Sequence, residues 1–187
     1  MALIDEARQA LQDGRLSDAR RAAEQTVRAA EGEEQLDAWL LLVEVQLLMN
    51  TRMEVARSLA MARRLAVSLG LPKKERMVRL FAVEAALLGD VDPSRELAAI
   101  RSEALPPEHA AWASALAAVA LARTAADATA ELAGARAGLA LGPQVAVRLL
   151  PWVVQAELAL GAPDRAVHAD RAGQVLAEAL GYRAHQG

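Results

Sequence analysis

Apolar residues recur at helical spacing along almost the whole chain, and Gly and Pro interrupt this pattern at intervals. Alternating Val, Ile or Thr runs bounded by turn residues, which indicate strands, are nearly absent. The pattern predicts an all-α protein with ten helices. The expected ranges are about 3–12, 17–32, 36–49, 53–69, 74–88, 93–105, 107–122, 126–142, 144–160 and, after a turn at 161–164, up to 181.

Three local signals refine these ranges. Ser17 is expected to cap the second helix, and Asp92 to cap the sixth with Pro93 at its first position. Pro151 lies inside the ninth range, where it removes a hydrogen bond. We therefore expect that helix to begin later than residue 144, or to kink at Pro151.

The ten helices pair into about five antiparallel hairpins. If Gly14, Asn50, Gly89, Arg123 and Gly161 are equivalent turn positions, the spacings are 36, 39, 34 and 38 residues. Two helices per period of this length are typical of stacked helical repeats. One hairpin cannot bury its apolar face alone, so the array is expected to form one cooperative domain at 1–182. Residues 183–187 are expected to fray.

Several positions within the hairpins match a known repeat signature of bulky and small residues. The fourth hairpin matches best, with Trp112, Ala128, Leu132 and Ala135. The other matches are Gly14, Ala19 and Ala23; Trp39, Leu59 and Ala62 with Val55 or Ala56; Phe81 and Gly89; and Gly161 and Ala166. With these residues the chain resembles the tetratricopeptide repeat family. Asp170, Ser94 and Arg101 depart from the family pattern, and aromatic residues are only 3% of the chain.

The resemblance implies a right-handed superhelical α-solenoid in which the first helix of each hairpin lines a concave groove. On that register the groove would present Val83 and seven polar residues as partner-binding candidates, namely Arg8, Asp37, Glu44, Arg76, Arg79, Arg148 and Gln155. Ala113, Ala117 and Ala120 would form its floor. Arginines bind carboxylates in bidentate fashion, so Arg76, Arg79 and Arg148 are expected to hold acidic groups of a partner. Alternatively, these arginines only solubilise an exposed face.

A narrower resemblance rests on two helix ends, Leu69-Gly70-Leu71-Pro72 and Ala179-Leu180-Gly181-Tyr182. These look like the sensor solenoids of large ATP-dependent bacterial transcription activators. The chain has no Gly-x-x-x-x-Gly-Lys loop, so it would correspond to the sensor part alone. This resemblance implies a regulatory sensor domain of a larger protein.

Residues that would support catalysis or metal binding do not form a recognisable pattern. The chain has no Cys, and His109, His168 and His185 share no helix face with a ligand cluster. No Ser has a recognisable His partner, and the run Glu31, Glu33 and Glu34 is typical of a solvated helix end. We therefore expect no enzyme activity, no metal and no cofactor. The tryptophans Trp39, Trp112 and Trp152 are expected in the core.

The charge distribution is uneven. The whole chain has a formal net charge of −3, yet residues 52–79 contain eight basic and two acidic residues. This segment is either a solvated helix face or a patch for an acidic partner. An acidic peptide or helix is favoured over nucleic acid, because no aromatic residues interleave with the basic ones.

The expected location is the cytoplasm of a bacterium. The start, Met1 to Glu6, lacks the pattern of a signal peptide, and Ala and Arg usage is typical of a GC-rich genome. The longest uncharged run, residues 109–122, is too short to span a membrane.

These observations favour a non-catalytic scaffold or adaptor that binds another protein in a preformed groove. Two alternatives stay open. One is the regulatory sensor domain, with a small-molecule effector. The other is a self-associating solenoid, because the last helix has the apolar residues Val167, Leu176 and Leu180 instead of a polar capping face.

Overall fold

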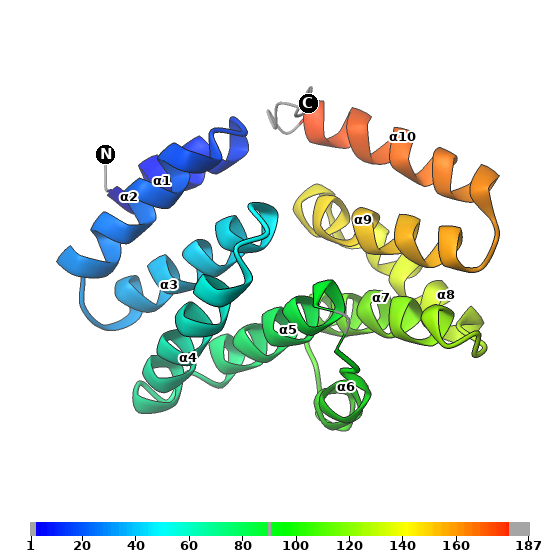
Figure 1. Cartoon of the computed structure of the whole chain (residues 1–187), viewed down its shortest axis with the longest axis horizontal. Coiled ribbons are helices and arrows are strands. Elements are labelled where there is room, and N and C mark those ends of the chain that lie inside the picture. Colours follow the sequence, from blue (N-terminus) through cyan, green and yellow to red (C-terminus); the bar gives the residue numbers. More distant parts are fainter. Residues whose placement is uncertain (1–2, 90, 180–187) are drawn as a thin grey trace. The chain divides into compact units, whose positions relative to one another are not determined.

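The computed structural model describes residues 3–89 and 91–179, which form ten α-helices and one short 3₁₀ helix with no strand (Figure 1). The expected frayed tail at 183–187 and Leu180 lie outside these residues. The helices are α1 (Leu3–Gln12), α2 (Leu16–Ala29), α3 (Gly32–Leu48), α4 (Arg52–Ser68), α5 (Pro72–Leu88), α6 (Ser94–Arg101), α7 (Pro107–Arg123), α8 (Thr129–Gly138), η1 (Leu139–Leu141), α9 (Pro143–Ala159) and α10 (Pro163–Ala179).

The sequence pattern located every one of these helices, but some of the expected boundaries were wrong. Helix α2 ends at Ala29 because Ala30 is extended, and α3 then begins at Gly32, earlier than residue 36. Helix α8 is shorter than the expected 126–142. Asp127 accepts a hydrogen bond from the backbone nitrogen of Thr129 at 2.9 Å and starts the helix there, and the last turn tightens into η1.

The expected caps are only partly correct. Helix α2 begins at Leu16 with Arg15 as N-cap, so Ser17 is not the cap. Asp92 does accept a hydrogen bond from the Ser94 backbone nitrogen at 2.9 Å, but Pro93 is the N-cap and the helix begins one residue later than expected. Helix α9 runs unbroken from Pro143 through Pro151, which is exposed, so the expectation of a later start was wrong.

The chain divides into two compact units, which are described separately. In the unit that contains residues 1–85, α1 packs against α2, α2 against α3 and α3 against α4, and α1 also packs against α3. In the unit of residues 86–180, consecutive helices from α6 to α10 pack against one another, and α7 also packs against α9. This sequential packing is compatible with a helical repeat.

In the part of the chain that the structure describes, the same capped turn occurs at six places, five of them within a helix pair and the sixth between α4 and α5, where Leu71 donates to Ala66 at 3.1 Å. In each turn a backbone N–H donates to a carbonyl five residues earlier, which is the outer bond of a Schellman cap. Within the helix pairs the acceptors are Ala10, Gln46, Ala86, Leu121 and Glu157, with N···O distances of 2.8 to 3.0 Å. They are 36, 40, 35 and 36 residues apart. The expected turn residues Gly14, Asn50 and Gly161 have positive φ, while in the fourth turn Ala125, not Arg123, has it.

Small residues let the helices approach closely. Ala7, Ala23 and Ala38 are buried with Ile4, Leu41 and Leu42 in one cluster of the first unit, against which half-buried Trp39 packs. In the second unit all four residues of the best sequence match, Trp112, Ala128, Leu132 and Ala135, are buried, as is Trp152. Asp170, Ser94 and Arg101, which depart from the repeat signature, are exposed.

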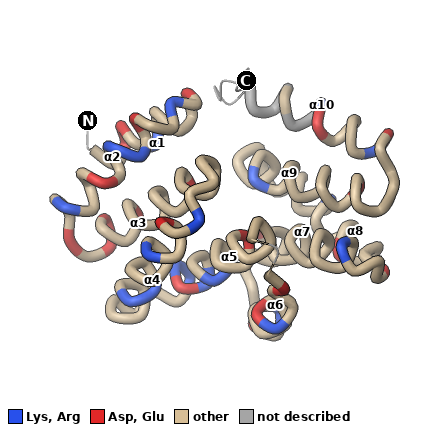
Figure 2. The backbone as a smooth tube through the Cα atoms, viewed as in Figure 1, with Lys and Arg blue, Asp and Glu red and all other residues tan. Residues whose placement is uncertain are grey.

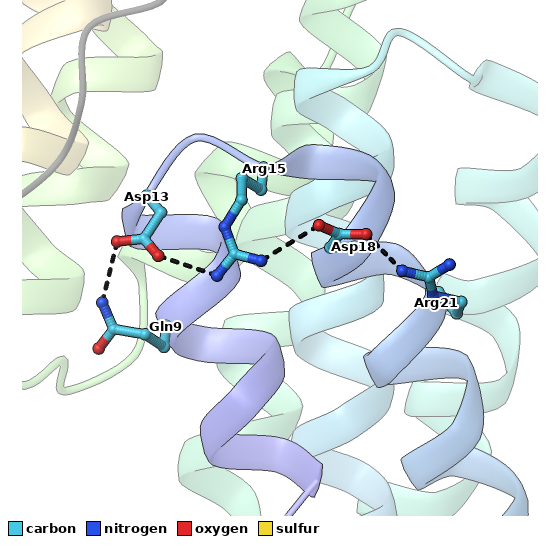
Figure 3. A network of polar contacts seen from close by, with 5 residues as sticks. All are labelled: Gln9, Asp13, Arg15, Asp18 and Arg21. Atoms are coloured by element: carbon cyan, nitrogen blue, oxygen red, sulfur yellow. Dashed lines mark hydrogen bonds and ion pairs between the residues drawn. The ribbon is translucent and has the colours of Figure 1, made fainter.

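A chain of polar side chains holds the first turn, between α1 and α2 (Figure 3). The Arg15 guanidinium donates to Asp13 at 2.9 Å and to Asp18 at 3.1 Å, and Gln9 donates to Asp13 at 3.0 Å. Arg21 also pairs with Asp18. The hydrogen bonds to the two carboxylates raise the pKa of Arg15. The network contains two carboxylates and two guanidinium groups, so its positive and negative charges balance.

Candidate partner-binding surface

A ladder of charged side chains joins the first helices of the hairpins in the first unit. Arg8 of α1 lies 3.9 Å from Asp37 of α3 and 3.4 Å from Asp5 on its own helix. Asp37 also pairs with Lys74 of α5, whose Nζ lies 2.8 Å from Glu33. The structure thus brings together two of the sequence-predicted residues, Arg8 and Asp37.

Lys74 is the most enclosed member of this ladder, with its side chain 18% exposed. Burial by itself lowers the pKa of Lys74, but hydrogen bonds to Asp37 and Glu33 outweigh it and raise the pKa. The ends of the ladder remain accessible, because the side chains of Arg8 and Glu33 are 51% and 62% exposed. A partner can therefore reach one positive and one negative group here.

Sequence reasoning missed Lys74 and placed Arg76 in its position. Residues two apart on a helix lie on nearly opposite sides, so the side of α5 that carries Lys74 is not the side of Arg76. The signal that could have found Lys74 is its spacing of 37 residues from Asp37, which is close to the spacing of the expected turn positions. Val83, expected in the groove, is 1% exposed and belongs to the core, so that expectation was wrong.

The other candidates of the first unit are half-buried. Arg76 is half-buried, and its Nε is enclosed without a hydrogen-bond partner. Arg79 and Glu44 are also half-buried and each has a polar partner. Glu44 lies seven residues after Asp37, so the two share a face of α3.

In the second unit, Arg148 of α9 lies over Trp112 of α7, with its Cζ 4.6 Å from the ring centroid. This cation–π contact again joins the first helices of two hairpins. Gln155, seven residues after Arg148, is half-buried. Ala113 and Ala117, expected as a groove floor, are instead buried within the helix packing, and only Ala120 of the three is half-buried.

A cavity of about 660 Å³ lies in the second unit between α8, η1, α9 and α10. Its walls combine apolar side chains with an ion pair whose carboxylate is buried and with a charged rim, formed by Leu139, Leu150, Val153, Ala169, Arg136, Glu157, Asp164, Arg165 and His168. Glu157 is 2% exposed and pairs with Arg136. A buried carboxylate at a cavity is a feature that sequence reasoning missed.

No group of three or more His, Asp or Glu residues at 3–89 and 91–179 is placed to hold a metal ion. None of the described helices is both long and apolar enough to cross a membrane.

Comparison with known proteins finds no family model that matches the chain, and no significant match among curated proteins or solved structures.

Proposed function

We propose that the chain is a tetratricopeptide-like solenoid of five helix hairpins that acts as a non-catalytic scaffold for another protein. The observation that carries this proposal is the repetition of one capped turn at intervals of 36, 40, 35 and 36 residues. The recurrence of this bond inside each helix pair at such intervals is expected when one hairpin unit is repeated, and the further bond from Leu71 to Ala66 ends α4 in the same way.

Side-chain contacts between hairpins support the repeat. Arg20 of α2 pairs with Glu54 of α4 at 2.9 Å, 34 residues later. In the second unit Arg101 of α6 pairs with Glu131 of α8 at 2.5 Å. Second helices thus contact second helices, while the ladder and the Arg148–Trp112 contact join first helices. Stacked hairpins produce this arrangement.

The first helices supply the binding surface in this proposal. Arg8 and Glu33 offer charges at the ends of the ladder, and Arg76 is a half-buried arginine of α5. A partner with carboxylates can extend these contacts by charge-assisted hydrogen bonds. Because the helices are already ordered, binding costs little conformational entropy.

The experiment begins with affinity capture by the full chain from lysate of its source organism, at low and high salt. The affinity of the recovered protein is then measured for the native chain and for the R76A/R79A/R148A variant. We expect a loss of at least tenfold, about 1.4 kcal/mol. R21A, which changes an exposed arginine of α2, is the control. Unchanged affinity in the triple variant would refute the proposed role of these arginines.

One observation favours a second candidate, a regulatory sensor domain that binds a small effector. The cavity of about 660 Å³ in the second unit has the size and the mixture of apolar walls and few polar groups that ligand sites have. A library of small metabolites tested by thermal shift distinguishes the candidates. An effector that raises the melting temperature of the native chain, but not of an L150W variant that fills the cavity, supports the sensor.

Self-association is measured in the same samples. Leu158, Leu160 and Val167 are exposed apolar residues of α9, its C-terminal turn and α10. A dimeric solenoid, instead of a scaffold for another protein, would be supported by two results together. The mass of the native chain would rise with concentration, and the mass of a V167D variant would stay at the monomer value.

A further inference from the structure

The outward side of α4 carries a regular stripe of exposed residues. Met53, Arg57, Ala60, Arg64 and Val67 follow one another at steps of four, three, four and three residues, so they share one side of the helix. The opposite side packs into the unit through Val55, Ser58, Ala62 and Ala66. Met53 is 87% exposed and Val67 57%, which is unusual for apolar side chains at the two ends of one stripe.

As far as the structure describes the chain, the arginines of this stripe lack the ion pairs that several arginines of the first unit make. Arg8, Arg15 and Arg20 each pair with a carboxylate. The one carboxylate on α4, Glu54, is held by Arg20 of α2. Among the described residues no ion pair joins Arg57 or Arg64 to an acidic group, and the same holds for neighbouring Arg63. Figure 2 shows the resulting basic segments of α4. The stripe therefore has uncompensated positive charge.

The order of residues along the stripe indicates which partner fits. A helix that lies in a membrane surface has apolar residues along the centre of its face and basic residues at the flanks. Here Arg57 and Arg64 lie in the middle of the stripe and the large apolar side chains lie at its ends. Single-stranded nucleic acid is bound with aromatic side chains, and the stripe has none. A row of side chains at steps of three and four residues is the surface with which one helix packs along another, and this stripe has that spacing.

We propose that this stripe, defined by Met53, Arg57, Ala60, Arg64 and Val67, docks an acidic amphipathic helix of another protein. The stripe runs over 15 residues, from Met53 to Val67, which is about 21 Å or four helical turns. Arg57 and Arg64 are seven residues apart, so they match two carboxylates seven residues apart on the partner. Apolar partner residues cover Met53 and Val67. None of the residues of the first-helix ladder lies on α4, so this surface stands independently of the function proposed above.

The test presents the full chain with a displayed library of 16-residue random peptides. The native chain is expected to enrich peptides with two acidic residues seven apart and apolar residues at steps of three and four. The R57E/R64E variant is expected to lose these peptides. The R21E/R28E variant is a matched control, because it reverses two exposed arginines of α2 that are also seven residues apart. This control is expected to keep them.

A selected peptide is then measured by fluorescence anisotropy. We expect its affinity to fall at least tenfold with R57E/R64E and also with M53S/V67S, and to stay within twofold with R21E/R28E. If R57E/R64E loses helical circular dichroism, R57Q/R64Q replaces it with the same expected direction. Peptides without acidic enrichment, or an equal loss in the control, would overturn the proposal. Sedimentation of the native chain, but not of R57E/R64E, with vesicles that contain phosphatidylserine would assign the stripe to lipid and overturn it too.

Discussion

Ala111 of α7 and Gly138 of α8 lie in close contact, since a Cβ placed on Gly138 would lie 2.3 Å from the Cβ of Ala111. The same atom would lie 2.9 Å from Leu149 of α9. The backbone of Gly138 is helical, with φ of −62°, so conformational freedom is not the reason for glycine here. The missing side chain allows three helices to meet at this point.

Gly138→Ala is therefore expected to destabilise the protein. Gly to Ala normally stabilises a helix interior by up to about 1 kcal/mol. Overpacking of a tight core costs about 1–3 kcal/mol. Because the contacts at Gly138 involve a backbone-fixed Cβ, overpacking outweighs propensity, and the free energy of unfolding should fall by about 1 kcal/mol or more.

Gly134→Ala is the matched control for that substitution, measured by the same urea denaturation. Its added Cβ would meet only the Ser114 side chain, at 3.1 Å to Oγ, and this hydroxyl can rotate. We expect Gly134→Ala to be neutral or stabilising. Equal effects at the two glycines would mean that the close approach of α7 and α8 does not decide stability.

Ala125→Gly is expected to stabilise the turn between α7 and α8. Ala125 has φ of 54°, in the left-handed region where a Cβ is unfavourable by about 1–2 kcal/mol. The equivalent residues Gly14 and Gly161 are glycines. Glycine also loses more entropy on folding, which offsets part of the gain. The midpoint of urea unfolding should rise by the equivalent of about 0.5–1 kcal/mol, whereas Ala137→Gly, in exposed helix, should lower it.

The fold was largely predictable because helix periodicity and turn residues are local signals. Gly14, Asn50 and Gly161 end their helices in the conformation that such residues favour. The fourth turn was misplaced at Arg123 because Ala125 carries no sequence signal for positive φ. Asp127 was missed as the start of α8 for a similar reason, since its side-chain bond to Thr129 is visible only in three dimensions.

The candidate surface was predictable only in part because it depends on helix rotation. The pairing of Arg8 with Asp37 follows from the expected first-helix register. In α5 that register failed. Helix α5 has half-buried or buried residues around most of its circumference, so its apolar pattern does not define one outward side. Lys74 therefore could not be distinguished from Arg76, and Val83 was placed in the groove although it is buried.

Arg136→Met is expected to destabilise the second unit more than the change in helix propensity explains. It leaves the carboxylate of Glu157 buried without its partner. Loss of one member of a buried pair costs about 3–5 kcal/mol of unfolding free energy. Because the Arg136 side chain is 42% exposed, we expect a smaller loss, about 2–3 kcal/mol. The double variant R136M/E157M should recover most of this stability, because it removes both charges. A double variant that is as unstable as R136M alone would contradict the buried-pair interpretation.

Lys74→Met is expected to destabilise the first unit in a pH-dependent way. The pKa of Lys74 is raised in the folded chain by its hydrogen bonds to Asp37 and Glu33, despite burial. A group with a raised folded pKa contributes its full stabilisation below its unfolded pKa, about 10.4 for lysine, and loses it as pH rises through the folded value. The loss of about 1–2 kcal/mol of unfolding free energy in K74M should therefore be constant from pH 7 to about 9.5 and should shrink above about pH 10.5.

Urea denaturation of the native chain, K74M and the exposed-site control K73M at several pH values measures this difference directly. Groups common to all three proteins cancel in the comparison, so a difference that grows with pH would mean that Lys74 is destabilised as a cation and that the ladder does not hold it.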